Sequence, residues 1–214
     1  MTAGRFITLE GGEGAGKSTQ ARLLAAALRR SGLGVTETRE PGGAPGAEVL
    51  RALLLAPPVA FSLEAEMLLH VAARAEHLAR TIRPALAAGD WVVCDRFADS
   101  TMAYQGYGQG ADRARIAALA AMLGTTPDLT LVLDVSEAVA AQRLAGRGRA
   151  ADRYEALDGA FHARVRAGFR AIATAEPARC VRIDADPAPE VVAAVVLAAV
   201  RARLPVPSGA GRAR

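Results

Sequence analysis

Residues 11–18 follow the pattern Gly-x-x-x-x-Gly-Lys-Ser, which constrains the fold of this chain more than any other feature. They lie between an apolar run at 6–9 and a stretch at 18–30 whose leucines and alanines recur at helical spacing. Glycines let backbone N–H groups turn inward around an anion, and the positive end of the following helix stabilises it. The segment therefore predicts a phosphate-binding loop, or P-loop, between a first strand and a first helix.

Lysine usage points to the same loop. The chain has 26 Lys and Arg residues, and Lys17 is its single lysine. An ammonium at this place reaches the β and γ phosphates of a nucleotide, and the Ser18 hydroxyl beside it can bind Mg²⁺. We predict Lys17 to be catalytic. The expected ATP-binding residues are Gly11, Gly12, Glu13, Gly14, Ala15, Gly16, Lys17, Ser18 and Thr19.

Apolar strands alternate with amphipathic helices along the chain. Strands are expected at 6–9, 35–38, 91–94, 129–135 and 180–183, and helices at 18–30, 63–86, 112–123, 137–144, 157–175 and 190–204. A turn-rich loop is expected near 40–46. Parallel strands need crossover helices, and nearly all-apolar strands are covered on both faces. We predict an α/β doubly wound fold, with a five-stranded parallel sheet and helices on both faces.

The domain organisation follows from the same pattern. No linker or internal repeat is visible, so we expect one domain over residues 1–204. The glycine- and arginine-rich stretch at about 146–153 is expected to be a lid, and residues 205–214 a flexible tail.

Composition argues against several classes of protein. The longest uninterrupted apolar run, at residues 191–200, is well short of the roughly 18 residues of a membrane helix. The net charge is +4, but the arginines are scattered rather than clustered, which argues against nucleic acid as a partner. The N-terminus lacks the apolar core of a secretory signal, so we expect a cytoplasmic location without a membrane partner. Cys94 and Cys180 have no CxxC spacing, and we expect both to be buried hydrophobes.

A metal-binding carboxylate is expected at the carboxyl edge of the sheet. Asp95 directly follows the strand at 91–94, where ligands bind in open α/β folds. It can hold Mg²⁺ together with Ser18, and the adjoining Arg96 can clamp a phosphate. A helix N-cap role for Asp95 is one alternative, and Asp134 after the next strand is another candidate for the metal.

Further motifs extend well beyond the loop. They are Thr38-Arg39-Glu40-Pro41-Gly42-Gly43, Ala72-Ala73-Arg74, Asp95-Arg96-Phe97 and Ser100-Thr101-Met102-Ala103-Tyr104-Gln105-Gly106. With the P-loop and the arginines of 146–153 they span residues 5–200, and the chain resembles bacterial thymidylate kinases of the nucleoside monophosphate kinase group. Adenylate kinases have a different glycine loop, and deoxynucleoside kinases usually carry Glu-Arg-Ser at positions 95–97. The resemblance implies phosphorylation of dTMP to dTDP with ATP and Mg²⁺, by a homodimer.

The resemblance also implies roles for single residues. Glu13 would lie near the deoxyribose, and Arg96 would clamp the acceptor phosphate and share the charge of the transition state. Arg74, helped by Thr101, would donate to a thymine carbonyl, while Tyr104 would leave no room for a 2′-hydroxyl. The expected dTMP-binding residues are Glu13, Arg39, Glu40, Pro41, His70, Arg74, Arg96, Thr101, Tyr104 and Gln105.

Two positions depart from the family pattern. His70 stands where relatives usually stack a Phe on thymine, and Met102 replaces a Gln found in some of them. A neutral imidazole can still stack, and we expect protonation to weaken binding below about pH 6.5. Alternatively, His70 is hydrogen-bonded on its helix and touches no ligand. His77 and His162 have no acidic or thiol partners at ligand spacing, so both are interpreted as structural.

The P-loop contains no arginine, so a transition-state cation must come from elsewhere. Arg147, Arg149 and Arg153 of the lid are the expected supply. Arg153 is favoured, with Arg149 next, because the family that the chain resembles places an arginine after an acidic residue such as Asp152. The alternative is a solvated basic loop.

Two other functions remain open. A kinase for another nucleoside monophosphate would share this machinery. A P-loop switch ATPase would bind nucleotide to control a partner, but it leaves Arg39, Arg74, Arg96 and Tyr104 without a role.

Overall fold

The computed structural model describes residues 4–55, 61–146, 148 and 153–206. Five parallel strands form one sheet in the order β2-β3-β1-β4-β5. The strands are β1 (Phe6–Glu10), β2 (Val35–Arg39), β3 (Trp91–Asp95), β4 (Leu129–Asp134) and β5 (Cys180–Asp184). The predicted α/β fold with a five-stranded parallel sheet is confirmed.

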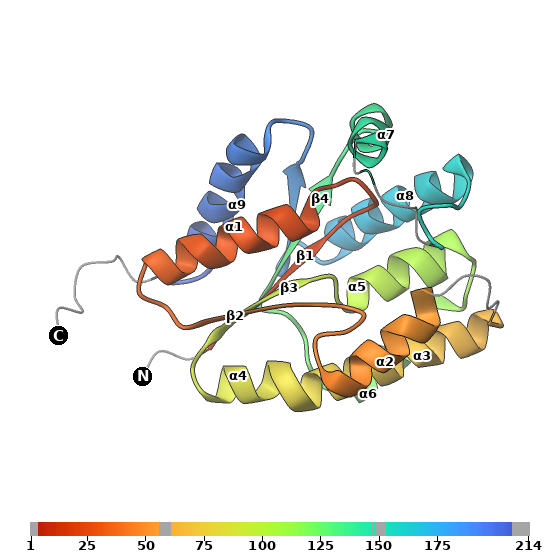
Figure 1. Cartoon of the computed structure of the whole chain (residues 1–214), viewed down its shortest axis with the longest axis horizontal. Coiled ribbons are helices and arrows are strands. Elements are labelled where there is room, and N and C mark those ends of the chain that lie inside the picture. Colours follow the sequence, from red (N-terminus) through yellow and green to blue (C-terminus); the bar gives the residue numbers. More distant parts are fainter. Residues whose placement is uncertain (1–3, 56–60, 147, 149–152, 207–214) are drawn as a thin grey trace.

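Helices cover both faces of this sheet (Figure 1). The α-helices are α1 (Lys17–Arg30), α2 (Pro45–Leu55), α3 (Leu63–His77), α4 (Arg83–Ala87), α5 (Ala98–Thr101), α6 (Arg113–Met122), α7 (Glu137–Ala145), α8 (Gly159–Ala175) and α9 (Pro189–Arg203). Two π-helical segments are η1 (Leu78–Ile82) and η2 (Met102–Gly108).

Strand residues alternate between two apolar layers. Ile7 and Leu9 of β1 pack in the cluster that includes the buried faces of α1 and α9. Phe6 points to the opposite face, where it joins Leu78 and Ile82 of η1. Successive side chains of a strand point to opposite faces, so a sheet covered on both sides needs apolar residues at every position. This explains why the strands are continuous apolar runs.

The structure differs from the sequence-based prediction in three helical regions. Residues 45–55 form α2, whereas only a turn-rich loop was predicted around 40–46. The expected helix at 63–86 is present but changes to π-helical hydrogen bonding at Leu78–Ile82. Pro84 has no N–H to donate to the preceding turn, and such residues commonly accompany this kind of local change. Residues 98–108, for which no helix was predicted, form α5 and η2.

Three further predictions concern the cysteines, membrane helices, and the lid and tail. Cys94 and Cys180 are both free and buried, as predicted. In the described part of the chain, no helix is both long and apolar enough to cross a bilayer. Most of the expected lid, including Arg147 and Arg149, and the tail from residue 207 on lie outside the described residues.

The strand register brings three sequence motifs to one edge of the sheet. Leu9 of β1 and Arg39 of β2 both pair with Asp95 at the end of β3. The Glu40 N–H donates to the Asp95 carbonyl over 2.9 Å, and the Arg96 N–H donates to the Leu9 carbonyl over 2.9 Å. The P-loop, the segment after β2 and the Asp95-Arg96 pair therefore meet where the strands end.

Candidate active site

The P-loop turns between β1 and α1 on glycines with positive φ. Gly14 has a φ of 75° and packs so closely on α7 that an added Cβ would lie 2.7 Å from the Ala140 carbonyl oxygen. Gly16 has a φ of 85° and caps the N-terminus of α1. Both positions need glycine, because side chains rarely tolerate this backbone conformation and Gly14 has no space for one. The loop so formed ends at the positive end of a helix.

Lys17 is the first residue of α1 and is buried in the loop. Its Nζ donates to the Gly12 carbonyl over 2.7 Å. Burial and the nearby Arg96 lower the pKa of Lys17 to about 8, against the attraction of Glu13 and Asp95. A bound polyphosphate would favour the charged ammonium and displace the backbone carbonyl as its partner. The side chain is thus poised to hold an anion.

Ser18 and Asp95 form a pair of oxygen ligands suited to Mg²⁺. The Ser18 hydroxyl donates to Asp95 Oδ2 over 2.5 Å. Asp95 Oδ1 is buried, and among the described residues it has no hydrogen-bond partner. An unpaired carboxylate oxygen beside a hydroxyl is a donor set that would suit a magnesium ion. The two carboxylate oxygens of Asp134, the alternative candidate, instead share the Nε–H of Arg170 on α8.

Arg96 lies between the P-loop and η2. Its Nη2 donates to Glu13 Oε1 over 2.5 Å and to the Tyr104 hydroxyl over 3.0 Å. The Tyr104 hydroxyl donates to the same Glu13 oxygen over 2.7 Å, and the Arg96 guanidinium lies 4.8 Å from the centre of the Tyr104 ring. Burial raises the pKa of the Tyr104 phenol, so it stays protonated as a donor. Three predicted site residues are therefore in direct contact.

Glu10 supports the Arg96 turn from below. Arg96 has a φ of 71°, an unfavourable value for a residue with a side chain. Glu10 Oε1 accepts from the Phe97 N–H over 2.7 Å, and Oε2 accepts from the Ser100 hydroxyl over 2.6 Å. Burial and the nearby Asp99 raise the pKa of Glu10 to about 7. Sequence reasoning missed this carboxylate because it looked like the last residue of an apolar strand.

A second buried cluster surrounds Arg74 of α3. Arg74 Nε donates to Glu40 Oε2 over 2.7 Å. Its Nη2 donates over 3.0 Å to both the Phe97 carbonyl and the Thr101 hydroxyl. Glu40 also contacts His77, which is fully buried on the same helix. His77 thus has an acidic partner, contributed by a segment distant in sequence.

His70 lies one helical turn before Arg74 and bonds to a residue beyond the lid. Its Nε2 is 3.0 Å from the Tyr154 hydroxyl. Burial, followed by the positive charge of Arg74, lowers the pKa of His70 to about 3. The lowered pKa favours the neutral ring. The reference pKa of about 6.5 applies to a solvated ring, so the weakening of binding expected from protonation moves to lower pH.

Glu66, on the same helix, collects the donors around this bond. Glu66 Oε1 accepts from both Gln105 and Tyr154 over 2.9 Å. Arg153 Nη2 donates to Glu66 Oε2 over 2.5 Å. Arg153, the favoured lid arginine, is thereby tied to α3.

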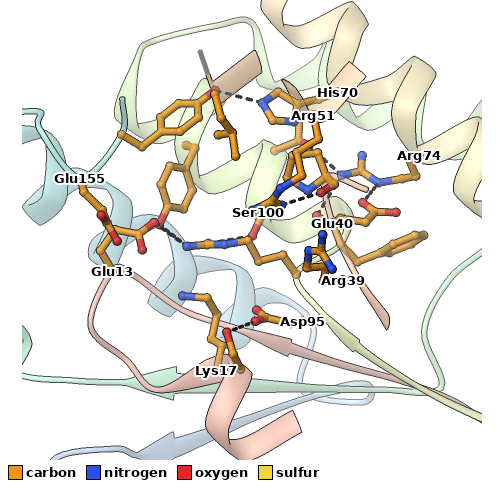
Figure 2. A pocket seen from close by; sticks show the side chains of 18 of the residues that line it. Glu13, Lys17, Arg39, Glu40, Arg51, His70, Arg74, Asp95, Ser100 and Glu155 are labelled. Carbon is orange, nitrogen blue, oxygen red and sulfur yellow. Dashed lines mark hydrogen bonds and ion pairs between the residues drawn. The ribbon is translucent and has the colours of Figure 1, made fainter. Parts of the chain in front are cut away.

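These clusters enclose a cavity of about 210 Å³. Figure 2 shows Lys17 and Asp95 at one end of it and His70 and Arg74 at the other. The predicted residues that line it are Glu13, Gly16, Lys17, Ser18, Thr19, Arg39, Glu40, Pro41, His70, Arg74, Asp95, Arg96, Thr101, Tyr104 and Gln105. Arg153 is not among the lining residues.

Other lining residues were missed from the sequence. They are Arg51, Leu55, Phe97, Ser100, Tyr154 and Glu155, of which Phe97 and Ser100 stood in the quoted motifs without an assigned role. Arg51 of α2 donates to the Pro41 carbonyl over 2.6 Å, a contact that no local motif marks. Arg143 of α7 was missed as well: it donates to the Gly14 carbonyl over 3.4 Å and to the Pro187 carbonyl over 3.0 Å, so it braces the outside of the P-loop.

The fold is that of the P-loop nucleoside monophosphate kinases: a parallel sheet with a P-loop after its first strand. The site agrees with that class, because cationic groups line the cavity beyond the P-loop. The family model for thymidylate kinase matches residues 9–196. The chain belongs to the thymidylate kinase family.

Similar proteins cover nearly the whole chain. A thymidylate kinase of Gluconobacter oxydans is 56% identical over 207 residues, which is 95% of this chain and 97% of the relative. One of Rhizorhabdus wittichii is 55% identical over 206 residues, covering 94% and 99%. The crystal structure of thymidylate kinase from Ehrlichia chaffeensis aligns with a TM-score of 0.75 at 36% identity, covering 92% of this chain and 99% of that one.

Proposed function

We propose that this protein transfers the γ-phosphate of ATP to dTMP, giving dTDP and ADP. The observation that carries the proposal is the cavity that runs from Lys17 of the P-loop to Arg74 of α3. It has a phosphate-binding loop at one end and a buried guanidinium suited to a base carbonyl at the other. Membership of the thymidylate kinase family supports the same acceptor.

On the donor side, the P-loop N–H groups and Lys17 bind the phosphates of ATP. Ser18 and Asp95 would hold Mg²⁺, and the ion would neutralise charge on the transferred phosphoryl group. Arg96 binds the acceptor phosphate. No strong general base is needed, because that phosphate is already an anionic nucleophile and catalysis is positioning plus charge stabilisation.

On the acceptor side, the sugar lies over Tyr104 and Glu13, and the base reaches Arg74. The Tyr104 hydroxyl is fixed by Glu13 and Arg96, so its ring cannot swing away to admit a 2′-hydroxyl. Gln105 and Pro41 border the base, and His70 stacks on it in the neutral form. Arg39 adds positive charge at the rim, where it pairs with Glu48.

The organisation around this centre is part of the proposal. Residues 1–204 belong to one catalytic domain. The location is cytoplasmic, and neither nucleic acid nor a membrane is a partner.

We also propose a homodimer. It is supported by exposed apolar side chains on neighbouring helices: Val49 and Leu53 of α2 and Leu68 of α3. The double variant Leu53→Glu, Leu68→Glu should sediment as a monomer. The control is Val191→Glu, which changes another exposed apolar side chain, on α9, and should leave the dimer intact. Wild-type protein that sediments as a monomer contradicts the proposal.

The acceptor assignment is tested with ATP, Mg²⁺ and a panel of monophosphates, by measuring ADP release. We expect dTMP to be the best acceptor, dUMP to be weaker because it lacks the methyl contact, and AMP, GMP and CMP to be near background. 5-Methyl-UMP, the ribonucleotide counterpart of dTMP, should be a poor acceptor in wild type. Its turnover relative to dTMP should rise in Tyr104→Ala. A ribonucleotide that outpaces dTMP would indicate a different monophosphate kinase. ATP hydrolysis without phosphate transfer to any acceptor would indicate a switch ATPase.

A further inference from the structure

His77 stands behind the acceptor site, in a chain of buried polar contacts. His77 Nδ1 is 3.0 Å from Glu40 Oε1, and His77 Nε2 is 2.7 Å from the Thr38 hydroxyl. The His77 side chain is 0% exposed, and it is not among the residues that line the cavity. Its environment links β2, the segment after it, and α3.

The contacts define which atom donates in each hydrogen bond of this buried series. An ionised carboxylate only accepts, so Nδ1 of His77 carries the proton that is donated to Glu40. In the neutral ring, Nε2 then accepts from the Thr38 hydroxyl. Glu40 uses its other oxygen, Oε2, for Arg74 Nε. The carboxylate is therefore held from both sides, by an imidazole and a guanidinium.

The bond to Glu40 in turn determines which nitrogen of the Arg74 guanidinium remains available to a ligand. Nε is taken by Glu40, and Nη2 by Phe97 and Thr101. In the described part of the chain, no hydrogen bond is seen for Nη1, while Arg74 lines the cavity. A rotation of the Glu40 carboxylate would release Nε and let the guanidinium turn away from this arrangement.

We propose that His77 is a positioning residue for the acceptor base: through Glu40 it fixes the guanidinium of Arg74 so that Nη1 faces the base. This inference rests on the proposed function, because it concerns the residue that recognises the acceptor.

The surrounding packing agrees with a polar role rather than space filling. A Cβ on Gly43 would clash with both His77 Nε2 and Thr38 Oγ1, so the backbone at Gly43 closes directly over this hydrogen bond. Gly43 is itself held, because its N–H donates to Glu48 and its carbonyl accepts from Thr81. An apolar residue in place of His77 would leave one oxygen of the buried Glu40 without its donor, which is costly in free energy.

Two amide variants separate the two ring nitrogens. The amide N–H of His77→Asn takes the place of Nδ1 and retains a donor for Glu40, while the longer His77→Gln reaches only the Nε2 position near Thr38. We expect His77→Gln and His77→Ala to raise the KM for dTMP about tenfold, with kcat and the KM for ATP within about twofold of wild type. His77→Asn should restore the KM for dTMP to within about threefold. Thr38→Val, which removes only the outer contact, should have a smaller effect than His77→Gln.

A purely structural role gives a different pattern. A loss of folded protein lowers the apparent kcat and leaves both KM values unchanged, so thermal unfolding is measured on every variant. Equal KM values for dTMP in wild type and His77→Gln would overturn the inference, as would equal damage in the Asn and Gln variants. If wild type does not phosphorylate dTMP at all, it is the proposed function that fails.

Discussion

Replacing Arg96 by alanine should lower kcat by about 10³-fold, one of the two largest effects expected in this protein. Phosphoryl transfer spreads negative charge over the transferred group, and arginines that neutralise it contribute about 10³ to 10⁵ in kcat in related chemistry. Arg96 lines the cavity, and its contacts with Glu13 and Tyr104 set its geometry before any ligand binds. The KM for dTMP should rise as well, because the same guanidinium holds the acceptor phosphate.

Steady-state kinetics with saturating ATP and Mg²⁺ measure this loss. Arg170→Ala is the matched control: Arg170 of α8 pairs with Asp134 at the end of β4 and does not line the cavity, so kcat should stay within about twofold. Arg96→Lys should recover little, since an ammonium cannot span two phosphate oxygens. A kcat within tenfold of wild type in Arg96→Ala would show that the charge is stabilised elsewhere.

The phosphate end of the site could be predicted from the sequence because its geometry is local. The glycines of the P-loop, Lys17 and Ser18 lie within eight residues, and a strand followed by a helix orients them. Asp95 and Arg96 could be added because parallel strands end at a common edge, and an acidic residue directly after a buried strand must lie there. The register that pairs Leu9 with Asp95 is the structural expression of that rule.

The base end could be located only in outline. The resemblance identified Arg74, but its orientation depends on Glu40 and His77, which meet through tertiary packing between the end of β2 and α3. Helix α2 was missed because the glycines and prolines before it look like a loop, although Pro45 is a favourable first residue of a helix. The missed Arg51 lies on this helix. The pKa of His70 likewise depends on a burial that periodicity does not reveal.

Arg153 is the residue for which the sequence and the structure give different emphasis. The sequence favoured it as the lid arginine that reaches the transferred phosphoryl group. In the structure it donates to Glu66, which also accepts from Tyr154 and Gln105. In one role, the ion pair holds the Arg153 guanidinium at Glu66 only until nucleotides bind. In the other, it anchors the end of the lid permanently to α3. These two roles make opposite predictions for Glu66.

If Arg153 supplies the transition-state charge, Arg153→Ala should lower kcat at least about 10²-fold and leave the KM for dTMP nearly unchanged. Glu66→Gln keeps the shape of the acceptor but removes its charge, so the guanidinium is released more easily and kcat should equal or exceed that of wild type. If Arg153 instead anchors the lid to α3, both Arg153→Ala and Glu66→Gln should lower kcat.

Single-turnover kinetics with both nucleotides bound separate these cases, and Arg153→Lys should rescue Arg153→Ala poorly if the guanidinium must span two oxygens. Should Arg153→Ala retain normal kcat, the same measurement on Arg147→Ala and Arg149→Ala identifies the cation within the lid. Normal kcat in all three variants would leave Arg96 as the cation of the acceptor side. In that case Arg96 must carry, with Lys17 and Mg²⁺, all of the charge that develops during transfer.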